Sequence, residues 1–130
     1  MSPRRAAQAL VEFAVVMPIL LIFILGVLDV GRGVVAASSI ANASREGARA
    51  AVVNYPAPGW DAEASSRARS AAVAIDSSLL SVAVSTEAQG GDTLVNVALS
   101  YPFRPVAPMV TMVASEIPLS AGARMLARGA

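Results

Sequence analysis

The feature that most constrains this chain is an apolar stretch near its N-terminus. From Phe13 to Leu28 it contains no ionisable side chain. A helix over these residues would be about 24 Å long, and counting from Ala9 extends it to about 30 Å, the thickness of the hydrocarbon core of a bilayer. We therefore predict a transmembrane helix over about residues 9–28.

Charges near the start of this stretch indicate its orientation. Arg4 and Arg5 precede the apolar residues, so the positive-inside rule predicts a cytoplasmic N-terminus and export of the rest of the chain. Glu12 lies within the span when it is counted from Ala9, and a carboxylate in a bilayer is energetically costly unless it finds a partner. Pro18 opposes a helix in water, but membrane helices tolerate proline.

Three other interpretations of the stretch stay open. It could be a cleaved secretory signal, with small residues at 35–37 as the cleavage site, although Glu12, Asp29 and Arg32 are unusual in such a signal. It could be a plain signal anchor in which Glu12 is incidental. It could also be the core helix of a soluble protein, although the remaining chain is small for surrounding it.

The helical pattern continues beyond the apolar stretch to about Val53. A helix over residues 8–53 would be about 69 Å long, too long to be covered by the small domain that follows, so we expect it to need neighbours. Small residues recur along it at the spacing that allows close helix packing: Gly33, Ala37 and Ala41, and then Ala43, Gly47 and Ala51. Because alanine is frequent here, chance alignment is the alternative.

The remainder predicts a linker over residues 54–60 and an exported α+β domain over residues 61–130. Prolines and a glycine end the long helix, and Asp61 is expected to cap a second helix over 62–75, closed at 76–78. Apolar alternation predicts strands at 79–87, 94–101 and 116–128, with a short helical turn at 109–113. Gly90 and Gly91 favour an antiparallel hairpin, and Pro118 favours a sheet edge. The prediction is one helix on a three-stranded antiparallel sheet.

Composition removes most catalytic chemistry. The chain has no His and no Cys, and its ten basic residues are all Arg, so zinc, thiol, imidazole and lysine chemistry are not expected. Net charge is +1, which gives no basis for nucleic-acid binding. The carboxylates show no pattern beyond caps and turns. We therefore predict no catalytic, cofactor-binding or metal-binding residues and no enzyme activity.

Three blocks, at residues 8–14, 26–32 and 43–50, resemble the TadE-like family over about residues 4–53. These are pilin-like proteins of tight-adherence (Tad, or Flp) pilus systems, which are related to type IV pili. The resemblance implies a minor pseudopilin of the bacterial inner membrane, single-pass, with residues 1–7 as a cytoplasmic leader. The implied partners are the lipid bilayer, other pilin-like subunits and the Tad inner-membrane machinery.

The resemblance also implies processing by a prepilin peptidase between Ala7 and Gln8. Glu12 would then be the fifth residue of the mature chain, and Glu12 and Phe13 would guide subunit docking. The family has Gly before the cut where this chain has Ala7, which leaves slow cleavage, a tolerant peptidase, or no cleavage.

The alternative is a signal-anchored module, unrelated to pili, that binds a partner or ligand outside the cell. Its contact loop would be residues 102–108 together with Tyr101.

Overall fold

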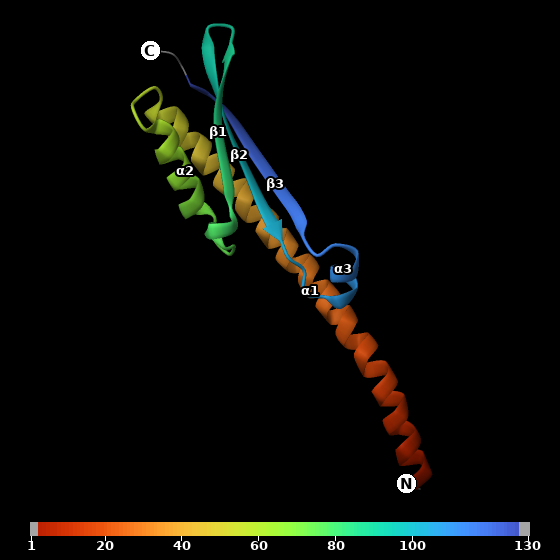
Figure 1. Cartoon of the computed structure of the whole chain (residues 1–130). Helices are drawn as coiled ribbons and strands as arrows, with labels where there is room; N and C mark the ends of the chain where they lie inside the picture. Colours follow the sequence, from red (N-terminus) through yellow and green to blue (C-terminus); the bar gives the residue numbers. More distant parts are fainter. Residues whose placement is uncertain (1–2, 128–130) are drawn as a thin grey trace. The chain divides into compact units, whose positions relative to one another are not determined.

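The computed structural model describes residues 3–127. Its helices are α1 (Pro3–Asn54), α2 (Trp60–Ala71) and α3 (Pro108–Val113), with a short 3-10 helix, η1 (Ser77–Leu79), and its strands are β1 (Ser81–Gln89), β2 (Asp92–Phe103) and β3 (Ile117–Ala127) (Figure 1). A long apolar N-terminal helix followed by a helix and a three-stranded sheet is the α+β arrangement predicted from the sequence. That prediction is confirmed.

The described residues form two compact units. The first contains the residues up to Arg32 together with Arg104–Glu116, and the second contains Gly33–Phe103 and the residues from Ile117 onward. α1 is assigned as one helix through both units, with Pro18 inside it. The apolar stretch and α3 therefore belong to the first unit, and α2 and the sheet belong to the second.

The sheet is antiparallel with the order β1-β2-β3. Gly90 and Gly91 form the hairpin turn with φ of 60° and 97°, a left-handed conformation that favours glycine. Pro118 pairs with Pro102 and lies on an edge strand, where a missing N–H is tolerated. The hairpin and the edge position were both expected from the sequence.

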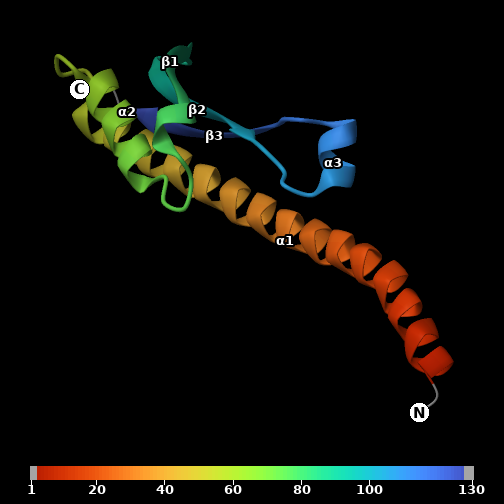
Figure 2. The same cartoon turned by 60° about the horizontal axis from the view of Figure 1, so that its bottom comes forward.

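The core of the second unit lies between one face of the sheet and two alanine-rich helices, as Figures 1 and 2 show. Val95, Val97 and Leu99 are buried on that face, in the alternation that the sequence predicted. The backbones approach closely at Gly47 of α1, where a Cβ atom would lie 2.9 Å from the Cβ of Ala68 in α2. Glycine and alanine therefore set the distance between the helices.

The predicted cap of α2 is wrong. Gly59, with φ of 82°, occupies the N-cap position and offers no side-chain cap. Asp61 instead lies in the first turn, where a negative side chain interacts favourably with the positive end of the helix dipole.

The predicted end of α2 is also wrong, because the helix stops at Ala71 rather than near Ile75. The backbone leaves helical geometry at Ala72, which has ψ of 72°, and Ala74 then adopts a left-handed conformation with φ of 66°, so the helix does not resume before residue 75. The hydroxyl of Ser39 in α1 donates to the carbonyl of Val73 in this turn. Asp76 caps η1 instead, accepting a 2.9 Å hydrogen bond from the Ser78 N–H.

Candidate functional site

The first part of α1 presents its apolar side chains outward. Leu10, Phe13 and Phe23 are 69%, 60% and 68% exposed. Within residues 3–127, α1 is the one helix long and apolar enough to cross a membrane, with a mean hydropathy of 2.7 in its most apolar part. A lipid bilayer is the environment that this composition suits.

The residues predicted for processing and docking lie on successive turns at the start of α1. Ala7, Gln8, Glu12 and Phe13 are all exposed. No hydrogen bond or ion pair joins Glu12 to any other residue in the part of the chain that the structure describes. The carboxylate that most needs a partner in lipid thus finds none within residues 3–127.

The two stripes of small residues have different environments. Ala43, Gly47 and Ala51 are buried in the second unit, so this stripe packs within the subunit. Along the other stripe, Gly33 faces the ring of Phe103, which a Cβ atom would approach to 3.8 Å, whereas Ala37 is exposed and Ala41 is half-buried.

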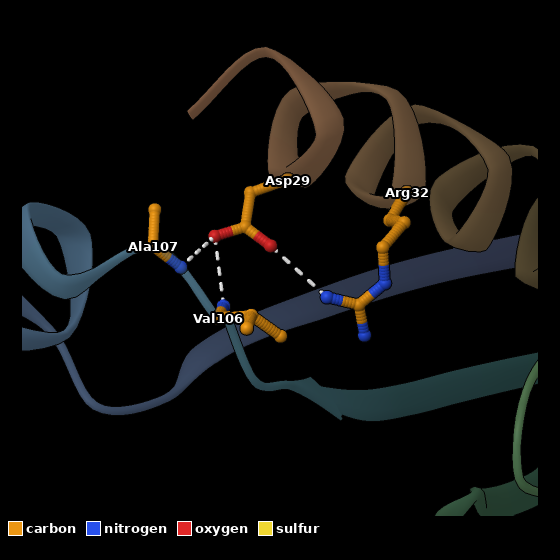
Figure 3. Close-up of polar contacts among 4 residues, drawn as sticks. All are labelled: Asp29, Arg32, Val106 and Ala107. Carbon is orange, nitrogen blue, oxygen red and sulfur yellow. Dashed lines mark hydrogen bonds and ion pairs between the residues drawn. The ribbon is translucent and has the colours of Figure 1, made fainter. Parts of the chain in front are cut away.

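The structure adds a polar site that sequence reasoning did not find, at Asp29 (Figure 3). One carboxylate oxygen of Asp29 accepts hydrogen bonds of 2.8 Å from the Val106 N–H and 2.6 Å from the Ala107 N–H. The other oxygen forms a 3.0 Å ion pair with Arg32, one turn further along α1. Asp29 is only 5% exposed, so a buried carboxylate holds the segment that leads into α3.

These contacts keep the site charged. The Ala107 N–H lowers the pKa of Asp29 most, burial opposes it, and the Val106 N–H and Arg32 lower it further. The net pKa lies below the ordinary value for Asp. A buried carboxylate that accepts two backbone N–H groups and pairs with Arg32 acts as a structural clasp between α1 and the segment before α3.

Residues of α1 on the N-terminal side of Asp29 and residues of α3 line an open apolar groove of about 560 Å³. Its lining residues are Ile19, Ile22, Phe23, Gly26, Val27 and Val30 of α1, and Ala107, Met109 and Val110 of the opposite segment. Arg104 and Glu116, at the two ends of the segment that contains α3, form an exposed ion pair at 3.4 Å.

The loop expected at residues 102–108 is partly structural. Pro102 belongs to β2, and both Phe103 and Pro105 are buried. Arg104 is exposed and ion-paired to Glu116, and Val106 is also exposed, so this segment is half packed and half open to its surroundings. Within residues 3–127, no group of three or more acidic side chains could hold a metal ion.

Comparison with known families finds a match in the helical part of the chain. Residues 7–49 match the model of the family described as TadE-like protein. This segment of the chain is TadE-like. The resemblance predicted from the sequence is confirmed over these residues. No curated protein and no solved structure matches the chain.

The TadE-like segment contains Glu12, the apolar stretch and Asp29. The N–H groups that Asp29 accepts from lie at residues 106 and 107, outside it. The matched helix thus supplies the carboxylate and Arg32, and the rest of the chain supplies the two backbone N–H donors.

Proposed function

We propose that this chain is a non-catalytic minor pseudopilin, a membrane-anchored component of Tad pilus assembly. The observation that carries the proposal is the TadE-like match over residues 7–49, which covers the whole apolar stretch of α1. An outward-facing apolar helix joined to a small α+β domain suits a subunit that is held in a membrane until it assembles.

Glu12 is the proposed docking residue. It lies among exposed apolar side chains and has no partner within residues 3–127. A carboxylate in lipid is strongly favoured to pair. Cleavage between Ala7 and Gln8 would create an amine on Gln8 of one subunit, and that amine could pair with Glu12 of its neighbour while Phe13 packs beside it.

The proposed topology follows from the arginines at positions 4 and 5. They would hold the N-terminus in the cytoplasm, with the sheet domain outside the cytoplasm and the chain in the inner membrane. The proposed partners are lipid, other pilin-like subunits, the Tad inner-membrane machinery and a prepilin peptidase. We propose no nucleic-acid partner and no cofactor.

The first test is the N-terminus of the protein isolated from membranes. A chain beginning at Gln8 supports the proposal. A chain beginning at Ser38 indicates a cleaved secretory signal, and one beginning at Met1 or Ser2 indicates an anchor that is not processed; either result would overturn the processing step.

The second test is piliation of cells that carry Glu12→Ala. We expect normal membrane insertion and strongly reduced assembly, because the apolar stretch is kept and the docking charge is lost. Glu46→Ala is the matched control, since Glu46 is an exposed carboxylate on the same helix but outside the apolar stretch. Normal piliation with Glu12→Ala would contradict the docking role.

A further inference from the structure

The α3 loop, defined as residues 104–116, is unusually apolar for a segment outside a core. Between its terminal residues Arg104 and Glu116 it contains no ionisable side chain. Its large side chains are nevertheless exposed: Met112 is 87% and Val113 is 90% exposed. A cluster of this kind marks a surface that is covered by something other than water.

The position of the loop identifies what covers it. The Asp29 clasp fixes Val106 and Ala107 beside the residue that directly follows the predicted span. Within the same unit, the groove that Met109 helps to line extends along α1 to Phe23 and beyond. Phe23 lies about 9 Å along the helix axis from Asp29, so the loop lies beside the last turns of the apolar stretch.

Several backbone N–H groups of the loop are either absent or hydrogen-bonded, as a segment in hydrocarbon requires. Pro105 and Pro108 have no N–H group, and the N–H groups of residues 106 and 107 donate to Asp29. The Val110 and Thr111 N–H groups donate to the Ala107 carbonyl, and the Thr111 hydroxyl donates to the Pro108 carbonyl. The N–H groups of these four residues therefore meet the condition for placing a segment in hydrocarbon, that backbone groups are paired.

Charged groups lie where the loop would leave the lipid. Arg104 and Glu116 form an ion pair at 3.4 Å with both side chains exposed. These two side chains can keep their charges in the headgroup region while the apolar side chains between them enter the lipid.

We propose that the α3 loop is a second membrane contact, which inserts Met109, Met112 and Val113 among the acyl chains of the leaflet on the exported side. The depth expected for an apolar face in the interface is about 5–10 Å, which agrees with its place beside the last turns of the apolar stretch. The proposal rests on α1 crossing the bilayer, as in the proposed function, and not on any role in a pilus.

Because the chain has no cysteine, single cysteines allow a direct test. The full chain would be placed in phosphatidylcholine vesicles with a fluorophore at Met112→Cys, at Val27→Cys in the span, or at Ser85→Cys on β1. Ser85 and Met112 are both exposed, so they are a matched pair. Two quenchers would be compared: iodide in water, and phosphatidylcholine that carries a nitroxide on its acyl chain.

We expect the label at Met112 to behave like that at Val27, with iodide quenching several-fold weaker than at Ser85 and strong quenching by the nitroxide lipid. Iodide quenching equal to that at Ser85 would overturn the proposal. Shielding from both quenchers that rises with protein concentration would overturn it too, because a second copy would then cover the loop. If Val27 is also open to iodide, α1 does not cross the bilayer and the proposed anchor fails with it.

Discussion

The carboxylate of Asp29 accepts a 2.6 Å hydrogen bond from the backbone N–H of Ala107, 78 residues away along the chain. This contact joins the end of the apolar part of α1 to the loop that carries α3. Together with the Val106 N–H and Arg32, it satisfies a buried charge with three donors, as buried carboxylates require.

Replacing Asp29 should release the loop. In Asp29→Ala the N–H groups of Val106 and Ala107 lose their acceptor, and a buried donor without an acceptor favours local opening. We expect amide hydrogen exchange at these two residues to be roughly 10- to 100-fold faster, while exchange within the sheet is unchanged. Exchange of the protein in detergent micelles, followed by mass spectrometry or NMR, measures both.

Two variants act as controls for that result. Asp29→Asn keeps an oxygen acceptor but loses the charge, so its effect should be intermediate. Glu116→Gln breaks the ion pair with Arg104, whose two side chains are 66% and 49% exposed, and exposed pairs contribute little. If exchange at Ala107 in Asp29→Ala matches the unmodified chain, the clasp does not hold the loop.

The clasp should persist to low pH. Because the Ala107 N–H and the other donors lower the pKa of Asp29, the contribution of this carboxylate to stability is present above the ordinary Asp pKa of about 3.9. It is lost only as the pH falls through the lowered folded pKa. In an NMR titration, the Ala107 amide signal should stay constant from neutral pH down to the ordinary value and move below it. Asp29→Asn should abolish that movement, and a midpoint above the ordinary value would contradict the assignment.

The sequence allowed much of this fold to be predicted, because its signals are local. Alternation of Val95, Val97 and Leu99 indicates a buried strand face, and Gly90 with Gly91 indicates a turn, without knowledge of the rest of the chain. The apolar stretch is a local signal too. The ends of elements were predicted less accurately. The turn that follows α2 contains the non-helical Ala72 and the left-handed Ala74, and it is held by a hydrogen bond from Ser39 of α1.

The Asp29 clasp could not be predicted in the same way. A carboxylate after an apolar stretch is visible in the sequence, but its donors are backbone N–H groups that carry no side-chain signal. Likewise, Gly47 and Gly33 look alike as small residues on a helix. Only the fold shows that one faces another helix closely and the other faces the ring of Phe103.

That difference between the glycines predicts opposite effects of alanine. In Gly47→Ala the new Cβ would lie 2.9 Å from the Cβ of Ala68 and 3.1 Å from Cγ1 of Val97. Overpacking costs about 1–3 kcal/mol, which exceeds the gain in helix propensity of about 1 kcal/mol. We expect a lower free energy of unfolding and a lower Tm.

Gly33→Ala is the matched control. Its Cβ would lie 3.8 Å from the Phe103 ring, an ordinary contact, so the gain in helix propensity should stand and raise stability by up to about 1 kcal/mol. Thermal unfolding of both variants in the same detergent tests the pair. Equal effects of the two substitutions would contradict the close approach of α1 and α2 at Gly47.

Processing at Ala7 should depend on the backbone around it. The peptide bond between Ala7 and Gln8 lies inside α1, which begins at Pro3, so a peptidase needs local opening of the first turns. Ala7→Gly opposes helix by about 1 kcal/mol and restores the glycine of the family pattern, so we expect a larger fraction of chains that begin at Gln8. Ala6→Gly loosens the helix equally but does not restore the pattern, so it is the matched control. If the fraction of chains that begin at Gln8 rises only with Ala7→Gly, the peptidase recognises the glycine. If the fraction rises equally with both variants, access to the helical peptide bond limits cleavage. If neither variant yields chains that begin at Gln8 in cells with an active prepilin peptidase, the proposed cleavage is wrong.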